Sequence, residues 1–148
     1  MSDPALLISA EREIAAPPEK IFDILADPSK HSLIDGSGSV QRPCVSAPAR
    51  LSLGAKFQMA MRIGVPYTIT NTVVEFEEGK KIGWRHFGAH VWRYELTPTE
   101  RGTLVRESVD YNDSTWPWAI RLLRYPGRTQ HAIEETLRCL DEAVTGGS

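Results

Sequence analysis

Between Lys56 and Tyr111, hydrophobic and polar residues alternate with the period of two that is typical of β-strands buried on one face. Phe57, Met59 and Met61, for example, are separated by polar or small residues. Four turn sequences divide this stretch into successive antiparallel strands. The turns are Gly64-Val65-Pro66, Glu78-Gly79, Gly88-Ala89 and Glu100-Arg101-Gly102. A looser alternation predicts a first strand over residues 8–14.

Helical spacing replaces this alternation in two parts of the chain. At the C-terminus, apolar residues at intervals of four, three and four form one stripe of a long helix: Ile133, Leu137, Leu140 and Val144. Near the N-terminus, Pro17-Pro18 precedes an apolar cluster and predicts a helix over about residues 18–26, which Asp27-Pro28 ends. A short helical turn over residues 30–34 and a loop over 35–39 follow.

This order of elements predicts an α+β fold, with residues 1–148 forming a single domain and about 7–145 its ordered core. One strand, two short helices, more antiparallel strands (about seven in all) and a long C-terminal helix follow one another along the chain. The final helix is the element available to cover the apolar face of the sheet. A strongly curved sheet wrapped around one helix leaves a cavity between them.

Charge and composition exclude several classes of protein. The formal net charge is −2, so the chain lacks the basic surplus on which nucleic-acid binding depends. No stretch approaches the roughly 20 apolar residues of a membrane span, and the N-terminus lacks the features of a signal peptide. We therefore expect a cytoplasmic protein without integral membrane association. Cys44 and Cys139 lie far apart, which argues against a disulfide framework or a zinc knuckle.

The residues of the concave face follow from registering the strands. Side chains directly opposite each other in an antiparallel pair share one face. The loops at 64–66, 78–79 and 87–89 are assigned three, two and three residues, the last because an odd number gathers the large aromatics on one face. The predicted rows are Asn71-His86-His90-Tyr111, Val73-Trp84-Trp92-Val109 and Tyr94-Glu107, with Phe57 opposite Val73 and Met59 opposite Asn71.

His86 and His90 raise the question of a metal site. Such a site needs three or four ligands, and these histidines supply two. His31, His131, the cysteines and Glu107 are possible third ligands, but no spacing nominates one of them. We therefore predict no metal and interpret the two histidines as polar residues at the mouth of a cavity.

Glu107 interrupts the apolar alternation of Val105, Val109 and Tyr111. A carboxyl group that faces a pocket has a raised pKa because burial disfavours its charged form, and this is the usual route to a general acid or base. Glu107 is therefore the candidate catalytic residue. The alternative is a structural or exposed glutamate in an ion pair, and a register slip of one residue would expose it.

Aromatic and methionine side chains are candidates for the remaining wall of the pocket. The aromatic row could bind a planar ligand by stacking, and Met59 and Met61 suit an adaptable apolar pocket, although both groups could equally be packed core. The segment 114–126 contains Trp118 on a helical stripe with Leu122 and Tyr125. It is interpreted as a lid, as a membrane-touching patch, or as a broken helix packed on the sheet.

The chain resembles the START-related polyketide cyclase/dehydrase and lipid-transport superfamily (SRPBCC). The resemblance runs from about Leu7 to Val144 and rests on motifs in a fixed order: IAAPPEKIFDILADPSKH, DGSG, NTVVEFEEGKKIGWRH, WRYELTP and GTLVRES. It implies the helix-grip fold, in which a curved sheet holds the C-terminal helix. It leaves the chemistry open, because one fold hosts carriers, cyclases, aromatases and chaperone partners.

Three functional hypotheses remain. The first is a protein that binds a hydrophobic small molecule, aromatic or lipid-like, in the cavity. Its predicted ligand contacts are Met59, Met61, Asn71, Trp84, His86, His90, Trp92, Tyr94, Tyr111 and Trp118. The second is an enzyme of the polyketide cyclase/aromatase type that uses Glu107 as acid or base. The third is a protein-interaction module with a vestigial cavity. None of the three implies a cofactor.

Overall fold

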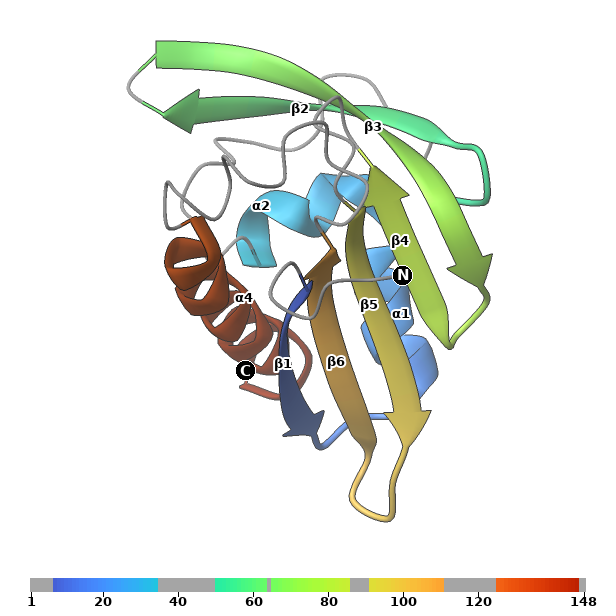
Figure 1. Cartoon of the computed structure of the whole chain (residues 1–148). Coiled ribbons are helices and arrows are strands. Elements are labelled where there is room, and N and C mark those ends of the chain that lie inside the picture. The colour runs from blue at the N-terminus through green and yellow to red at the C-terminus, as the bar shows by residue number, and fades with distance from the viewer. Residues whose placement is uncertain (1–6, 35–49, 64, 86–90, 111–124, 147–148) are drawn as a thin grey trace.

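The computed structural model describes residues 7–34, 50–63, 65–85, 91–110 and 125–146. It contains a six-stranded antiparallel sheet in the order β1-β6-β5-β4-β3-β2 (Figure 1). The strands are β1 (Leu7–Ile14), β2 (Lys56–Ile63), β3 (Val65–Glu77), β4 (Lys81–Arg85), β5 (Val91–Pro98) and β6 (Thr103–Asp110). The α+β class and the curved sheet are confirmed, while these residues form six strands rather than about seven.

The long C-terminal helix α4 (Tyr125–Asp141) packs beside β1 and β6 and against the short helix α2 (His31–Ile34; Figure 1). Its predicted apolar stripe is buried: Ile133, Leu137 and Leu140, with Val144 in the π-helical turn η3 (Glu142–Gly146) that follows. Near the end of α4, Asp141 accepts a hydrogen bond of 2.7 Å from Arg12 of β1. The helix is thus held to the sheet by apolar burial along its length and by an ion pair at its end.

Helix α1 (Pro18–Leu25) begins at Pro18, as the Pro17-Pro18 pair predicts, and ends one residue before the expected position. It buries Ile21, Phe22 and Leu25, and the Phe22 ring meets the edge of Phe76 at 5.5 Å. A 3₁₀ turn, η2 (Pro28–Lys30), and α2 (His31–Ile34) come next, so the two short helical elements after the first strand are both present.

The predicted register of β2 and β3 is wrong by two residues. Phe57 lies opposite Asn71 and Met59 opposite Ile69, and the pairing continues to Ile63 opposite Val65. A three-residue loop at 64–66 is therefore excluded. Because the shift is an even number, it leaves Phe57 and Asn71 on the face that the alternation assigned to them.

Between β3 and β4, two differences from the predicted pairing cancel each other. The turn leaves three residues unpaired, between Glu77 and Lys81, rather than two, and the register shifts between Val73 and Glu75 in the manner of a β-bulge. Val73 consequently lies opposite Trp84, as predicted. The bulge also changes the phase of β3, so Phe76 packs inward on α1 and Glu75 lies on the convex face.

The register of β4, β5 and β6 is confirmed. Trp84 lies opposite Trp92, which the odd-loop hypothesis required. Tyr94 in turn lies opposite Glu107, and Trp92 opposite Val109. The aromatic residues of these central strands therefore share the concave face.

On the convex face, an ion pair crosses β4 at Gly83. Arg93 donates hydrogen bonds of 2.5 and 2.8 Å to the two carboxylate oxygens of Glu75, and both side chains are partly buried. Gly83 lies between their strands, opposite both residues. A Cβ atom added at Gly83 would lie 2.8 Å from Glu75 Oε1, so a glycine is needed for this close approach.

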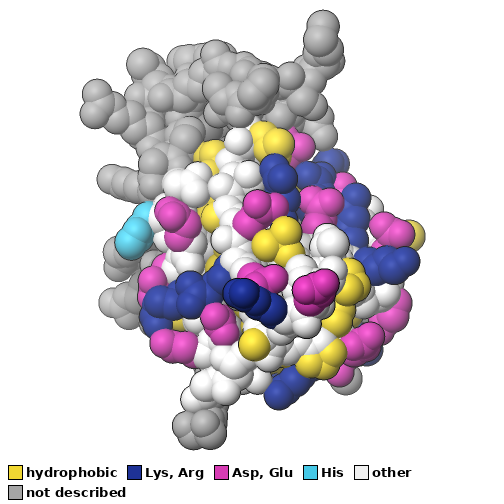
Figure 2. Space-filling model, turned by 90° about the horizontal axis from the view of Figure 1, so that it is seen from below, with side chains coloured by type: hydrophobic (Ala, Val, Ile, Leu, Met, Phe, Trp, Pro, Cys, Tyr) yellow, Lys and Arg dark blue, Asp and Glu magenta, His cyan; other side chains and the backbone are white. Residues whose placement is uncertain are grey.

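The face seen in Figure 2 carries acidic and basic side chains in alternation, with hydrophobic side chains scattered among them. Some exposed charges of the molecule are paired: Arg138 of α4 forms ion pairs with Glu135 of the same helix and with Glu142, the first residue of η3. Such exposed pairs contribute little to stability individually, because water and salt screen the attraction between the charges.

We predict that Gly83→Ala lowers the free energy of unfolding by about 1 kcal/mol, because the new methyl group displaces the Glu75 carboxylate from Arg93. In a Glu75→Ala background the same substitution should cost much less, since the obstructing side chain is gone. Urea unfolding of the four proteins in a double-mutant cycle measures this coupling. An equal cost in both backgrounds would show that Gly83 is required for another reason.

Candidate functional site

Six buried residues form a group of aromatic and polar side chains, which we term the concave cluster. It consists of Phe57, Asn71, Trp84, Tyr94 and Glu107 from the sheet and His31 from α2. Alternation along the central strands directs the sheet residues inward, and α2 brings His31 onto them. The cluster therefore combines apolar ring surface with groups that donate or accept hydrogen bonds.

Glu107 is the most deeply buried polar residue of the cluster, with 0% of its surface exposed. It lies in β6 between Tyr94 of β5 and Ala10 of β1. The Tyr94 hydroxyl donates a hydrogen bond of 3.0 Å to Glu107 Oε2. The carboxyl group thus faces inward beside Tyr94, as the register predicted.

Aromatic contacts connect the cluster. The Trp84 indole lies 5.5 Å from the Phe57 ring in an edge-to-face arrangement and 5.6 Å from the Tyr94 ring. The His31 imidazole stacks on Trp84 at 5.0 Å, with 22° between the ring planes. Trp84 is therefore the central contact from which the cluster extends to His31 on one side and to Tyr94 and Glu107 on the other.

His31 was predicted only as a possible metal ligand and was missed as a member of this site. Its Nε2 atom lies 2.9 Å from the Leu25 carbonyl oxygen at the end of α1. Burial lowers the pKa of His31 below its ordinary value, while the Leu25 carbonyl and the charge of Asp27 oppose that shift. The imidazole is consequently neutral at neutral pH. No local sequence signal marked His31, since its environment is formed by strands distant in the chain.

The other predicted site residues are distributed differently. Trp92 is partly buried opposite Trp84. Met59 and Met61 lie in β2, paired with Ile69 and Tyr67. Four predicted site residues lie outside the described residues: the histidine pair His86 and His90, Tyr111 of the same predicted polar row, and Trp118 of the predicted lid.

A metal site is not formed by the parts of the chain that the structure describes: no three histidine, cysteine, aspartate or glutamate side chains there are arranged to hold an ion. Within the same residues, no helix is both long and apolar enough to cross a bilayer.

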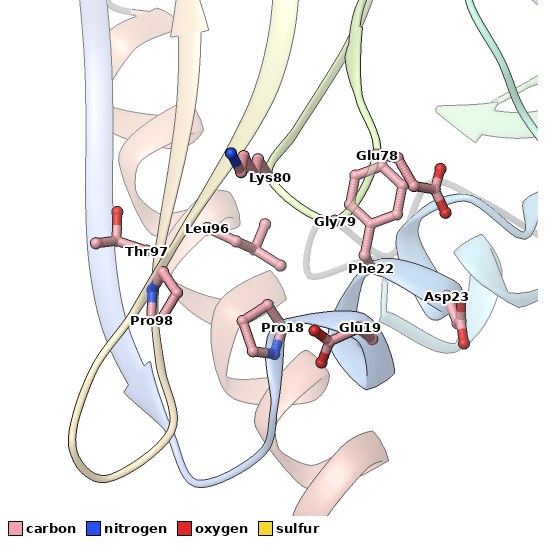
Figure 3. A pocket seen from close by; sticks show the side chains of 10 residues that line it. All are labelled: Pro18, Glu19, Phe22, Asp23, Glu78, Gly79, Lys80, Leu96, Thr97 and Pro98. Carbon is pink, nitrogen blue, oxygen red and sulfur yellow. The ribbon is translucent and has the colours of Figure 1, made fainter.

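A separate hollow of about 320 Å³ lies between α1, the β3–β4 turn and the end of β5 (Figure 3). Phe22 and Leu96 form its apolar part, and charged side chains stand around the rim. Its lining residues are Pro18, Glu19, Phe22, Asp23, Glu78, Gly79, Lys80, Leu96, Thr97 and Pro98. Arg50 donates hydrogen bonds to Asp23 and Glu78 and lies over the Phe22 ring, so two rim carboxylates already have a cationic partner. This hollow was not foreseen, because it joins segments far apart in sequence.

We predict that His31 makes stability depend on pH on the acidic side of neutrality. Its folded pKa lies below the unfolded value of 6.5, so the unfolded state takes up the proton first. The stability that a neutral His31 contributes is therefore fully present above pH 6.5 and is lost as the pH falls through the folded pKa. Denaturant unfolding at a series of pH values should show this decline in the wild type and a weaker one in His31→Phe.

His131, which is exposed on α4, provides the matched control, since His131→Phe should retain the wild-type pH dependence. The carboxylate of Glu75 does not interfere in this range: its hydrogen bonds from Arg93 lower its pKa below 4.5, so its contribution is lost only at more acidic pH. A wild-type decline that persists unchanged in His31→Phe would rule out His31 as its source.

Comparisons with known proteins place these features in a family. Residues 6–144 match the family model described as polyketide cyclase / dehydrase and lipid transport. The chain is 40% identical over 109 residues to the Mycobacterium tuberculosis protein Rv0088, a match that covers 71% of this chain and 47% of that protein. The chain thus spans about half the length of the curated relatives it matches.

Two solved structures illustrate the likeness in fold. Protein Ms6760 from Mycobacterium smegmatis superposes with a TM-score of 0.74 at 20% identity, over 100% of this chain and 97% of that one. The AHSA1-like protein from Aeromonas hydrophila gives 0.66 at 18% identity, over 93% of each chain. The chain therefore belongs to the polyketide cyclase/dehydrase and lipid-transport family of the START-related SRPBCC superfamily and has its helix-grip fold.

Proposed function

We propose that this protein binds a hydrophobic small molecule, aromatic or lipid-like, between the concave face of the sheet and helix α4. The supporting observation is the composition of the concave cluster, in which aromatic rings accompany the buried Tyr94–Glu107 pair and the Trp84 ring lies against Tyr94. Ligand pockets in proteins have this character, with mostly apolar and aromatic walls and a few polar groups that fix orientation.

The polar members of the cluster favour binding over simple packing. Burying a polar or ionisable group costs free energy that an apolar side chain of similar size avoids. Asn71, Glu107 and His31 are each less than 5% exposed on a face that otherwise packs aliphatic and aromatic residues. Buried ionisable groups with a specific partner are candidates for recognition or chemistry, and Glu107 and His31 are such groups.

The proposed contacts follow from this arrangement. Trp84 and Trp92 would supply planar surface for stacking, and Met59 and Met61 an adaptable apolar wall. Tyr94 and Asn71 would orient polar atoms of the ligand. We extend the proposal to the mouth of the proposed binding site, where the sequence predicts His86, His90, Tyr111 and Trp118.

A second candidate is an enzyme of the polyketide cyclase/aromatase type, and the hydrogen bond between Tyr94 and Glu107 is the observation that favours it. In this function, Glu107 would take a proton from, or give one to, a carbon chain folded in the cavity. Tyr94 would hold the carboxyl group in position. A buried carboxyl group fits general acid–base catalysis, because burial brings its proton affinity nearer to the working pH.

Native mass spectrometry of the freshly purified full chain tests the binding function. We expect a population with the added mass of a small molecule that organic extraction removes. The extracted compound should bind again to the emptied protein. The proposal fails if no added mass is found and if hydrophobic fluorescent probes also show no saturable binding, an outcome that would favour an interaction module.

We predict that Glu107→Gln separates the two functions. Glutamine retains size and hydrogen bonding but lacks the titratable proton, so a carrier should keep its affinity within a few-fold and its melting temperature should be equal or higher. In a cyclase, turnover should fall by roughly 10²-fold or more while binding is retained. Glu77→Gln, at an exposed position of β3, is the matched control and should change neither property. Undiminished turnover in Glu107→Gln would remove Glu107 from the mechanism.

A further inference from the structure

The protonation pattern of His31 follows from one contact. Nε2 lies 2.9 Å from the Leu25 carbonyl oxygen, and a carbonyl oxygen only accepts hydrogen bonds. Nε2 must therefore carry the hydrogen. Since burial keeps the ring neutral at neutral pH, Nδ1 carries a lone pair and no hydrogen. His31 is thus a donor toward α1 and an acceptor at its other nitrogen.

The acceptor atom, Nδ1, is buried, and no described residue donates a hydrogen bond to it. The imidazole stacks on Trp84, and the Phe57 ring meets it at 5.4 Å with 77° between the planes. Buried acceptors in native proteins are nearly always paired, so a lone pair held in aromatic surroundings requires an explanation.

The hydrogen bond that connects α2 to the end of α1 does not explain why the Nδ1 lone pair is buried. The bond to Leu25 uses Nε2 alone, and an indole N–H, which has no acceptor atom, would make the same bond without burying a lone pair. The second nitrogen has a use only if a donor reaches it. Trp84 connects His31 to Tyr94, so this acceptor and the Glu107 carboxyl belong to one continuous cluster.

We propose that His31 Nδ1 accepts a hydrogen bond from a hydroxyl group of the ligand, and that the ligand is an aromatic alcohol whose ring lies against Trp84. This inference rests on the proposed binding function and specifies its ligand class. A hydroxyl group on an aromatic ring supplies both the donor and the flat apolar surface that the cluster matches. An anionic ligand suits the site less well, because burial among apolar rings disfavours a charged group.

A matched pair of probes tests this class. 1-Naphthol donates a hydrogen bond, whereas 1-methoxynaphthalene has the same ring system and cannot. By titration calorimetry the wild type should bind 1-naphthol roughly 3- to 10-fold more tightly. His31→Phe keeps an aromatic ring but removes the acceptor, so it should bind the two compounds equally. His131→Phe, exposed on α4, should retain the wild-type preference.

A second measurement requires no substitution at His31. In protein labelled with ¹⁵N-histidine, the Nδ1 resonance of His31 should move upfield on addition of 1-naphthol, as it does when an imidazole lone pair accepts a hydrogen bond. It should stay in place with 1-methoxynaphthalene. His131 reports any nonspecific effect of the probes.

The outcomes distinguish this inference from the proposed function. If both compounds bind with equal affinity and Nδ1 does not move, hydrophobic binding stands and the hydroxyl assignment is overturned. If Nδ1 is already hydrogen-bonded in the protein alone and 1-naphthol leaves it unchanged, water or another residue of the chain is the donor and the assignment is likewise overturned. If neither compound binds, the aromatic alcohol class is rejected, and native mass spectrometry decides the binding function separately.

Discussion

The inward alternation of β4, β5 and β6 is the constraint on which the rest of the structure depends. Paired residues in these strands share a face, so the pairing of Trp84 with Trp92 also fixes where Tyr94 and Glu107 point. A slip of one residue would turn the aromatic side chains outward, each at a cost of roughly 1.5–3 kcal/mol of lost burial. Hydrophobic burial thus determines the position of a carboxyl group whose own burial is unfavourable.

Both the stability and the chemistry of the cluster follow from this opposition between favourable burial of aromatic groups and unfavourable burial of polar groups. The aromatic residues and the stripe on α4 supply the burial that holds the interior together, and the polar residues oppose it. The Tyr94–Glu107 and His31–Leu25 hydrogen bonds offset part of that opposition. Under this balance, replacing a polar member by a neutral residue of the same shape affects recognition or chemistry more than the fold.

Much of this arrangement was predictable from the sequence, because the number of residues in a loop, odd or even, decides which face of the sheet the next side chains occupy. Gathering the tryptophans on one face required an odd loop, which also placed Tyr94 on that face. Continuing the same inward face into the next strand then gave the pairing of Tyr94 with Glu107. The absolute register of β2 and β3 was not accessible, because shifts by two residues preserve every face. Val73 was correctly predicted opposite Trp84, but a two-residue turn was assumed. In the structure a longer turn shifts the register by one residue, and the bulge in β3 shifts it back. His31 and the hollow beside α1 depend on contacts between distant segments, which periodicity does not report.

The bulge in β3 also bears on how the length of the chain can change. Val74 is the additional residue between Val73 and Glu75, whose partners in β4, Trp84 and Gly83, are adjacent. If Val74 were deleted, Val73 and Glu75 would become neighbours and keep those partners. Phe76 would still point toward α1, and the Glu75 carboxylate would still lie on the side of Arg93. A gap at this position in an aligned relative would therefore represent a straightened strand with the same inward and outward faces, and the concave cluster would retain its geometry.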